Sequence, residues 1–450
     1  MFDTIAAIST ALGVGAISII RVSGPDSIKI VNKLFKGKDL TKVDSHTIHY
    51  GHIIYNDEII DEVLISVMKS PRTFTTEDIV EINSHGGIST TNKVLELLLN
   101  NGARLADPGE FTKRAFLNGR IDLVEADGIM NVIASKTDKA RRQSINQLSG
   151  KVSNRIKCLR DKLVAIIANI EVNIDYPEYE DINEVTTDEI KPSLLDFKQE
   201  LERIISKSVE GKIINQGINV GIFGRPNVGK SSLLNALLEE EKAIVTDIEG
   251  TTRDIVEGSI NLNGIILNII DTAGIRETDN IVERIGVEKS KSIMETCDLS
   301  ILILNNNEKL TEEDIKLLDT IKNKKHIILI NKIDLENKLD VSHISGDYLK
   351  ISIAQDRGIE EFKQKIIELF NLGELETEDL TYLSDARSIS LLKKSLSYIE
   401  ESIISIDNEE PIEMVEINIK EAWNTLGEII GETYKEELLD ELFKRFCLGK

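Results

Sequence analysis

The sequence predicts a multidomain protein with α/β and all-helical parts, in which a doubly wound α/β domain is inserted into a helical domain. A chain of 450 residues is too long for one hydrophobic core, so it should contain several domains. Buried strands alternate with helices between about residues 215 and 375, which is typical of a parallel sheet with helices on both faces. Helical patterns flank that stretch, so its two ends should lie close together and the flanking helices should pack against each other.

Four segments follow from the pattern of apolar residues. Short β-rich runs such as AISIIRV and DIVEIN alternate with the helical run TNKVLELLLNNG at the start of the chain. Apolar side chains then recur at spacings of three and four from Ile145 to Ile170, as one long amphipathic stripe, until the acidic stretch DYPEYEDINE interrupts it. We therefore expect an N-terminal α/β domain over residues 1–118, the first half of a helical domain over 119–214, the inserted domain over 215–375 and the second helical half over 376–450.

Composition and charge exclude several classes of protein. The formal net charge is -23, so the chain as a whole repels phosphate backbones, and any nucleic-acid contact must be a local patch or come through a partner. The sequence shows no signal peptide and no uncharged run of the roughly 20 apolar residues that a membrane helix needs, so we expect a cytoplasmic protein without a membrane span. The cysteines Cys158, Cys297 and Cys447 lack CxxC spacing, which excludes a disulfide scaffold and a four-cysteine zinc site.

The motif GRPNVGKS, Gly224 to Ser231, directly follows the strand-like run INVGIF and opens the helical run SSLLNALLEE. Its glycines let backbone N–H groups turn inward around the α and β phosphates of a nucleotide. Lys230 adds a positive charge near the β and γ phosphates, and the Ser231 hydroxyl can ligate Mg²⁺. In this strand–loop–helix context the motif indicates a P-loop.

Two further motifs identify the base. DTAG, Asp271 to Gly274, ends a hydrophobic strand, where Asp271 can hold Mg²⁺ through water and the Gly274 N–H can contact the γ phosphate. NKID, Asn331 to Asp334, ends the next strand but one. The Asp334 carboxylate can accept both N–H groups of the guanine edge, while Lys332 lies along the base. Adenine presents no such pair of donors, so the sequence predicts a Ras-like P-loop domain that binds GTP.

The loop TDIEGTTRD, Thr246 to Asp254, lies between the first two motifs. Thr251 or Thr252 can supply the second hydroxyl ligand for Mg²⁺, and we assign Thr252. The last guanine-contacting element usually reads Ser-Ala-Lys, whereas this chain has Ser-Ile-Ala from Ser352. The residues that we expect to contact GTP are Asn227, Val228, Gly229, Lys230, Ser231, Ser232, Thr246, Asp247, Ile248, Glu249, Gly250, Thr251, Thr252, Asp271, Thr272, Ala273, Gly274, Asn331, Lys332, Asp334 and Ser352.

The residue after DTAG bears on how water attacks the γ phosphate. Ras-like enzymes carry a Gln there that orients the water, but this chain has Ile275, whose side chain forms no hydrogen bond. Water activation must come from elsewhere. Glu277 and Glu283 are the local candidates for this role. The alternative interpretation, that both are solvated residues of a switch helix, fits the sequence equally well.

Taken over its full length, the sequence resembles the MnmE (TrmE) family of tRNA modification GTPases. The resemblance rests on IIRVSGP, on EINSHGG at 81–87, on DPGEFTKRAFLNGRIDLVEADGIMNVI at 107–133, on DTAGIRETDNIVERIG and on the final FCLGK. It implies an enzyme that acts with the flavoprotein MnmG (GidA), which carries FAD, in a heterotetramer or larger complex. Together they would add a carboxymethylaminomethyl or aminomethyl group to carbon 5 of the wobble uridine of tRNA.

The resemblance also implies a folate site and a homodimer in the N-terminal domain. The one-carbon donor would be a 5-formyl- or methylene-tetrahydrofolate, and the matching residues are Arg21, Glu81, Arg120 and Lys450. Arg120 replaces the Lys usual in LNGKLDL, which keeps the charge and changes its geometry. Without the family, a salt-bridged surface would be the preferred interpretation of the first three residues.

Two catalytic residues and a cation follow from the same resemblance. The family uses K⁺ in place of an arginine finger when two guanine domains meet, and motif matching assigns the K⁺ ligands to Asn227, Thr246, Ile248 and Thr251. Glu283 would act on the attacking water through a bridging water. Cys447, beside Lys444 and Arg445, would have a lowered pKa and act in the folate or uridine chemistry, although a half-buried structural cysteine is the alternative.

Two other functions fit the nucleotide motifs alone. A ribosome-assembly or translation-linked switch should carry a basic RNA-binding module such as a KH domain with a GxxG loop, and none is visible in the sequence. A regulatory GTPase that needs an external activating protein predicts negligible hydrolysis by the purified chain. Hydrolysis activated by K⁺ predicts the opposite.

Overall fold

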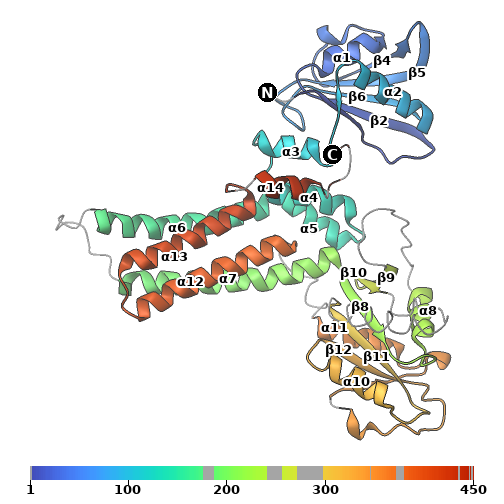
Figure 1. Cartoon of the computed structure of the whole chain (residues 1–450), viewed down its shortest axis with the longest axis vertical. Helices are drawn as coiled ribbons and strands as arrows, with labels where there is room; N and C mark the ends of the chain where they lie inside the picture. Colours follow the sequence, from blue (N-terminus) through green and yellow to red (C-terminus); the bar gives the residue numbers. More distant parts are fainter. Residues whose placement is uncertain are drawn as a thin grey trace. The chain divides into compact units, whose positions relative to one another are not determined.

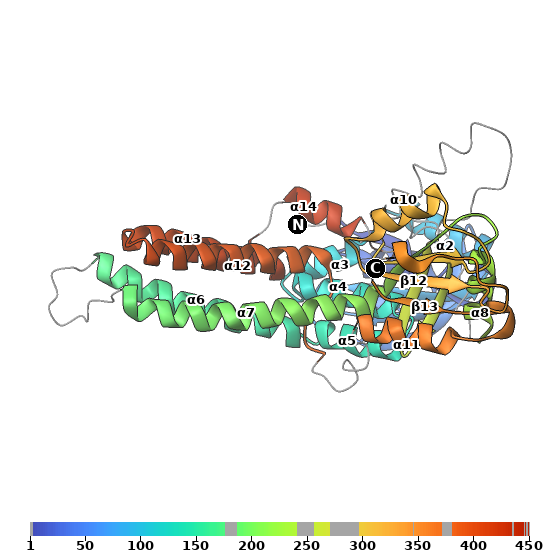
Figure 2. The ribbon, with the colours of Figure 1, turned by 90° about the horizontal axis from the view of Figure 1, so that it is seen from below.

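The computed structural model describes residues 3–175, 187–240, 256–270, 297–344, 346–370, 380–433, 436–444, 446 and 449 (Figures 1 and 2). The chain folds into two compact units, each built from segments that are far apart in the sequence. The first unit comprises Met1–Met130, Leu148–Lys191 and Ser397–Lys450, and the second comprises Asn131–Gln147 and Pro192–Leu396. No helix within the described ranges is long and apolar enough to cross a membrane.

The first unit contains a seven-stranded sheet in its described residues, with the strand order β3-β4-β5-β6-β2-β1-β7. Its pairs are antiparallel except for β1 with β7. Helices α1 and α2 pack on one face, where Val22, Ile65, Val80 and Leu97 are buried in a common core. The bounds are β1 Ile5–Ile8, β2 Gly15–Ser23, α1 Ser27–Leu34, β3 Phe35–Lys36, β4 Thr47–Tyr55, β5 Glu58–Met68, β6 Ile79–Gly86, α2 Ile88–Asn100 and β7 Arg104–Leu105.

A hairpin replaces what reads in the sequence as one long β-rich run, HIIYNDEIIDEVLISVM. Strands β4 and β5 are joined by Asn56 and Asp57, whose φ angles are 50° and 64°. Asn and Asp tolerate this left-handed conformation better than other non-glycine residues, and two such residues in succession form the tight turn that matches the twist of paired strands. The turn therefore explains why the run folds back on itself.

Helices make up most of the chain between and after the two sheets (Figure 1). In the first unit, α6 packs along α13, and the buried faces of both are lined by Ile, Leu and Val. The bounds are α3 Glu110–Leu117, α4 Leu123–Ala134, α5 Asp138–Leu148, α6 Lys151–Asp175, α7 Thr187–Gln216, α12 Ala386–Asp407, α13 Ile412–Ile430 and α14 Glu436–Phe443.

The expected single stripe from Ile145 to Ile170 is wrong as one helix. Helix α5 ends at Leu148 and α6 begins at Lys151, and between them Gly150 has a φ of 76°, which favours glycine and ends a helix. Ile145 is 42% exposed, so it does not share the buried face of α6. Apolar residues recur at helical spacing in both α5 and α6, so the sequence pattern did not reveal the break between the two helices.

The second unit contains the doubly wound domain that the sequence predicts. In the described residues its sheet has six strands in the order β13-β12-β11-β8-β10-β9, all parallel except that β9 runs antiparallel to β10. Helices α8 and α11 bury apolar residues against one face, and α10 does so against the other. The bounds are β8 Ile218–Phe223, α8 Lys230–Glu240, β9 Val256–Leu262, β10 Ile265–Ile270, β11 Leu299–Asn305, α10 Glu312–Ile321, β12 His326–Asn331, β13 Tyr348–Lys350 and α11 Ile359–Leu369.

The points where the chain enters and leaves this domain are joined by side-chain amides that donate to one buried serine, Ser384. The Gln147 Nε2 atom donates to the Ser384 hydroxyl at 2.8 Å, and the Asn215 Nδ2 atom donates to the same oxygen at 2.7 Å. Ala140 of α5 and Ile214 of α7 belong to the apolar core of the domain. The two ends of the inserted domain therefore lie together, within the second unit.

Candidate functional site

The P-loop connects the carboxyl end of β8 to α8, as its motif predicts. Gly224 has a φ of 142°, and a Cβ atom there would lie 2.5 Å from the carbonyl oxygen of Ile303 on β11. Gly229 has a φ of 112°, and its Cβ would lie 2.4 Å from the Nδ2 atom of Asn331. Both positions accept only glycine because of these close approaches. The loop therefore lies against the ends of two neighbouring strands.

The Lys230 ammonium lies over the P-loop itself. Its Nζ atom donates to the carbonyl oxygens of Gly224 at 2.6 Å and of Arg225 at 2.9 Å. Burial lowers the pKa of Lys230. Ser231 and Ser232 follow it in the first turn of α8 and are exposed. The lysine is thus held where phosphate oxygens can replace the two carbonyls as acceptors.

The NKID motif forms hydrogen bonds with the same loop. The Asn331 Nδ2 atom donates to the Val228 carbonyl at 2.9 Å, and the Lys332 Nζ atom donates to the Asn227 carbonyl at 2.9 Å. The Asn331 Oδ1 atom accepts from its neighbour Lys332 N at 2.8 Å. The phosphate-binding loop and the base-recognition motif are therefore one connected structure.

The base-recognition side contains a short contact between Asp334 and Ser352. The Ser352 hydroxyl donates to the Asp334 Oδ1 atom at 2.5 Å, and Ser352 is fully buried while Asp334 is exposed. One carboxylate oxygen of Asp334 is thereby fixed by the element whose Ser-Ile-Ala sequence departs from the usual pattern. Although this element reads Ser-Ile-Ala where Ser-Ala-Lys is usual, its serine still contacts the aspartate.

Many of the expected nucleotide-binding residues, and three of the expected catalytic and folate-binding residues, lie outside the described part of the chain. Strand β9 begins at Val256, after the TDIEGTTRD loop, and β10 ends at Ile270, directly before DTAG. The residues concerned are Thr246, Asp247, Ile248, Glu249, Gly250, Thr251, Thr252, Asp271, Thr272, Ala273, Gly274, Glu283, Cys447 and Lys450.

A second polar site lies on the sheet of the first unit, around Arg21. Its guanidinium forms an ion pair with Glu81 at 2.8 Å and lies 5.7 Å from the centre of the Phe111 ring on α3. The Arg21 Nη1 atom also donates to the Gly449 carbonyl at 3.3 Å, and the Ser9 hydroxyl donates to the same oxygen at 3.1 Å. The sequence did not indicate Ser9, Phe111 or Gly449. Neither the Phe111 ring under Arg21 nor the Gly449 carbonyl, which accepts from Ser9 and Arg21, belongs to a recognisable sequence motif.

Arg120 lies beside the apolar cluster that contains Phe111, the ring over which Arg21 lies. Its Nη1 atom donates to the Phe74 carbonyl at 2.9 Å, and its guanidinium lies 5.0 Å from the centre of the Phe74 ring. Phe74 packs against the buried cluster that is formed by Ile5, Ala7, Ala106 and Phe111. The structure thus places Arg21, which is paired with Glu81, over Phe111, and it places Arg120 over Phe74.

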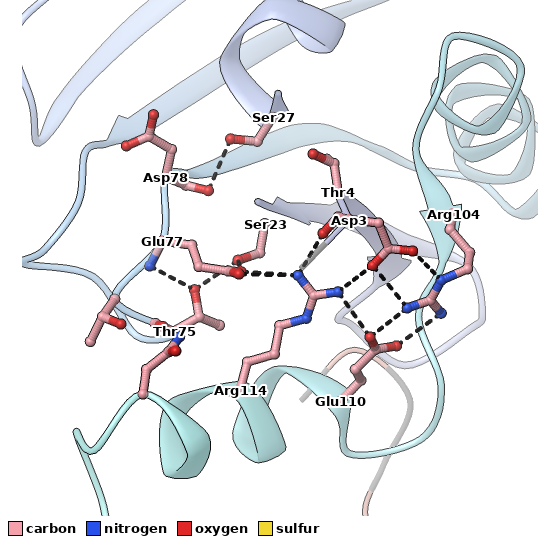
Figure 3. Close-up of polar contacts among 12 residues, drawn as sticks. Asp3, Thr4, Ser23, Ser27, Thr75, Glu77, Asp78, Arg104, Glu110 and Arg114 are labelled. Atoms are coloured by element: carbon pink, nitrogen blue, oxygen red, sulfur yellow. Dashed lines mark hydrogen bonds and ion pairs between the residues drawn. The ribbon is translucent and has the colours of Figure 1, made fainter. Parts of the chain in front are cut away.

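A partly buried ion-pair network, drawn in Figure 3, fixes α3, the helix that carries Phe111. The Arg114 side chain, only 2% exposed, projects from α3 and pairs with Asp3 at 2.8 Å, Glu77 at 3.2 Å and Glu110 at 3.0 Å. Arg104 pairs with Asp3 at 2.7 Å and with Glu110 at 2.6 Å. Hydrogen bonds from Arg104, with a further one from Arg114, lower the pKa of Asp3 to about 2.

The parallel sheet, the P-loop on its central strand and the NKID motif bonded to that loop define a Ras-like P-loop GTPase domain. The comparisons with known proteins place that domain in a particular family. The chain belongs to the MnmE family of tRNA modification GTPases, and it is therefore a GTP-binding GTPase that takes part in tRNA modification. A family model described as "GTP-binding protein TrmE N-terminus" matches residues 4–120, and one described as "MnmE helical domain" matches residues 123–447.

Relatives match over the full length. The tRNA modification GTPase MnmE of Streptococcus thermophilus is 51% identical over 451 residues, covering 100% of this chain and 99% of the relative. The Bacillus cytotoxicus protein of that name is 51% identical over 456 residues, with 100% of both chains covered. Its counterpart from Lactococcus lactis subsp. cremoris is 50% identical over 449 residues, with 100% and 99% covered.

Solved structures match a smaller share of the chain. A variant of Aquifex aeolicus Era bound to GDP and aluminium fluoride is 26% identical and covers 40% of this chain and 66% of that one, with a TM-score of 0.28. The G domain of the T. maritima FeoB iron transporter is 30% identical and covers 34% of this chain and 98% of that one, with a TM-score of 0.27.

Proposed function

We propose that this GTPase acts in the cytoplasm with the flavoprotein MnmG (GidA) and its FAD to modify the wobble uridine of tRNA. The group added at carbon 5 is carboxymethylaminomethyl or aminomethyl, and a 5-formyl- or methylene-tetrahydrofolate supplies the carbon. The observation that carries the proposal is that one chain holds two chemically different sites. One is the P-loop bonded to NKID, and the other is the Arg21–Glu81 pair beside aromatic rings.

Mg²⁺ binding would use the first turn of α8. Ser231 is exposed directly after Lys230, so its hydroxyl is available as a ligand, and Thr252 would supply the second hydroxyl. Mg²⁺ neutralises charge that develops on the β and γ phosphates during transfer. Lys230 and Ser231 both lie in the first turn of α8, so a metal held by the Ser231 hydroxyl would lie beside the same phosphate groups as the lysine.

K⁺ would replace an arginine finger. Asn227 is exposed at the tip of the P-loop with a φ of 63°, and its backbone is fixed by Lys332, so its side-chain amide is free to ligate a cation. Thr246, Ile248 and Thr251 would complete the site. A monovalent cation beside the phosphates stabilises negative charge as an arginine does. Glu283 would act on the attacking water, the role that Ile275 cannot fill.

The folate would bind at the Arg21 site. The guanidinium groups of Arg21 and Arg120 match the carboxylates of a folate, Glu81 is an acceptor for the N–H groups of its pterin, and the partly exposed Phe74 ring offers flat apolar surface, while the buried Phe111 ring lies beneath Arg21. Lys450 would add a further charge, and the Cys447 thiol would act in the folate or uridine chemistry. Bound there, the folate supplies a one-carbon unit.

A homodimer would form through the sheet face that carries Arg21. Tyr50, Leu64 and Ile19 stand in register across β4, β5 and β2 through Asn83 of β6, and the outward Tyr50 and Leu64 are 62% and 47% exposed. Ile17 on the same face is 63% exposed. An apolar row of this kind on a sheet face marks a protein contact. Dimerisation there would place two folate sites on one surface and tether two guanine domains.

GTP hydrolysis in K⁺ and in Na⁺ at equal ionic strength tests the proposal. We expect a large stimulation that is specific to K⁺ and is abolished by Asn227→Ala and by Glu283→Ala, while both variants still bind GDP. Asn323→Ala, an exposed asparagine of the same domain, is the matched control and should behave as wild type. Equal and low rates in both salts would contradict the K⁺ mechanism and favour a switch that a partner activates.

A further inference from the structure

Arg225 is the second residue of the P-loop, and its side chain is engaged by two carboxylates. The Nε atom lies 3.0 Å from the Asp314 Oδ2 atom, and the Nη2 atom lies 2.6 Å from the Glu308 Oε2 atom. The Arg225 side chain is 21% exposed, and that of Asp314 is 3% exposed. An arginine that bridges two carboxylates is held in one orientation, because its charged N–H groups have fixed directions.

Both carboxylates are themselves held in place. Asp314 lies in the first turn of α10, where its carboxylate accepts from Thr311 N at 3.0 Å and from the Thr311 hydroxyl at 2.8 Å, as part of a capping box. Glu308, in the loop after β11, accepts from the Asn305 Nδ2 atom at 2.7 Å. The pairing partners of Arg225 are thus fixed by the folded domain and do not depend on a nucleotide.

The backbone of Arg225 faces the functional lysine. Its carbonyl oxygen accepts from the Lys230 Nζ atom at 2.9 Å. On the other side of the loop, Asn331 and Lys332 donate to the carbonyls of Val228 and Asn227. Residues outside the P-loop therefore hold it at two places. Glu308 and Asp314 hold its start by pairing with Arg225, and the NKID motif holds its tip.

We propose that Arg225 is a positioning residue for nucleotide binding. Its ion pairs with Glu308 and Asp314 form a clamp that holds the P-loop in its binding conformation. The guanidinium does not act on the γ phosphate of its own domain or of a partner's domain. This inference rests on the proposed function in one respect. Because the Arg225 guanidinium is paired with two carboxylates, another cation must stabilise the charge on the phosphates, and the proposed function assigns that role to K⁺.

The clamp predicts an effect on affinity and not on turnover. In Arg225→Ala, part of the binding energy for GDP is used to order the loop, so the Kd for GDP should rise about tenfold in both K⁺ and Na⁺. At saturating GTP, the K⁺-stimulated kcat should stay within about threefold of wild type. Arg225→Lys keeps a charge that reaches only one carboxylate, and it should recover part of the affinity. Glu308→Gln should weaken GDP binding less than Arg225→Ala.

Fluorescent GDP titration and steady-state hydrolysis on the full chain test the clamp. Lys309→Ala, which removes a positive charge from an exposed neighbour of Glu308, is the matched control and should leave the Kd unchanged. The effects of Arg225→Ala and Glu308→Ala on the Kd should be less than additive in the double variant, because both break the same pair. Should Arg225→Ala fail to fold, Arg225→Lys and the two Glu308 variants give the same comparison.

Three results would overturn the clamp. A loss of kcat of a hundredfold or more with an unchanged Kd would show that the guanidinium acts on the phosphates, as an arginine finger does. A wild-type Kd for GDP in Arg225→Ala, or effects on the Kd that are additive in the double variant, would show that the ion pairs do not position the loop. A wild-type enzyme without K⁺ stimulation would contradict the proposed function alone, because the GDP titration in Na⁺ still decides the role of Arg225.

Discussion

The side-chain amide of Asn331 donates a hydrogen bond of 2.9 Å to the main-chain carbonyl of Val228, and so joins the base-recognition motif to the phosphate loop. Val228 is buried, so no water replaces this donor in the folded domain. The bond links the carboxyl ends of β12 and β8, which the sheet order separates by β11. This bond, together with the one from Lys332 to the Asn227 carbonyl, joins the NKID motif to the P-loop.

Asn331→Ala should weaken both the fold and nucleotide binding. The Val228 carbonyl would remain buried without its partner, which costs about 1–3 kcal/mol in the free energy of unfolding. Urea denaturation of the purified protein measures that change, and GDP titration measures the loss of affinity. Asn323→Ala removes an exposed amide from the same domain and should change neither quantity. Wild-type stability in Asn331→Ala would show that the contact contributes little.

Asp334→Asn should change which base is bound. In the proposed site the carboxylate would accept two guanine N–H groups, whereas an amide would present a donor toward them, so the affinity for GTP should fall at least thirtyfold, as expected for the loss of a hydrogen bond to a charged group. Xanthosine triphosphate, which offers an acceptor at that edge, should bind the variant better than the wild type. Competition with labelled GDP measures both affinities. Asp356→Asn, in the following turn, should retain the preference for GTP.

Stability in acid should depend on Asp3. Ion pairs with Arg104 and Arg114 hold its folded-state pKa at about 2, below the ordinary value of 3.8. Because the folded pKa is depressed, the stabilisation is present above about pH 4 and is lost as the pH falls toward 2. Urea unfolding between pH 7 and pH 2 should therefore show a smaller loss of stability in Asp3→Asn than in wild type. Parallel curves for the two proteins would show that these pairs do not stabilise the fold.

Gly211→Ala should destabilise the second unit, although alanine is ordinarily the better helix former. A Cβ atom at this position of α7 would lie 2.4 Å from the Gln143 Nε2 atom and 2.9 Å from the Leu383 carbonyl. Such overpacking costs about 1–3 kcal/mol in the free energy of unfolding. Lys212→Ala, the next position of the same helix, should cost less than Gly211→Ala. Thermal unfolding of both variants decides the matter, and a higher Tm for Gly211→Ala would contradict the packing.

The doubly wound domain could be predicted because its signals are local. INVGIF, GRPNVGKS and NKID each carry a strand end or a turn with its functional side chain, and the carboxyl ends of parallel strands meet at one edge of a sheet. That geometry alone brings Lys230 and Asn331 together. The Ser352–Asp334 contact could not be foreseen with the same ease, because the surrounding Ser-Ile-Ala departs from the usual pattern.

Contacts between distant segments were beyond the reach of sequence patterns. Arg21, Glu81 and Arg120 were connected only through the family resemblance, and nothing in the sequence indicated that Phe74 and Phe111 lie beneath the two arginines. The break at Gly150 was missed because α5 and α6 share one apolar period. The Arg225 pairs were missed because Glu308 and Asp314 read as surface acids near the start of a helix.

Reconstitution of tRNA modification tests most directly whether hydrolysis at one site drives chemistry at the other. The purified protein would be mixed with the flavoprotein partner, methylene-tetrahydrofolate, an amine donor (ammonium or glycine), K⁺ and unmodified tRNA, and the wobble nucleoside would be identified by mass spectrometry. We expect modified uridine with GTP, none with a non-hydrolysable GTP analogue, and none with Lys230→Ala or Arg21→Ala. Equal modification with the analogue and with GTP would contradict the coupling of hydrolysis to the modification.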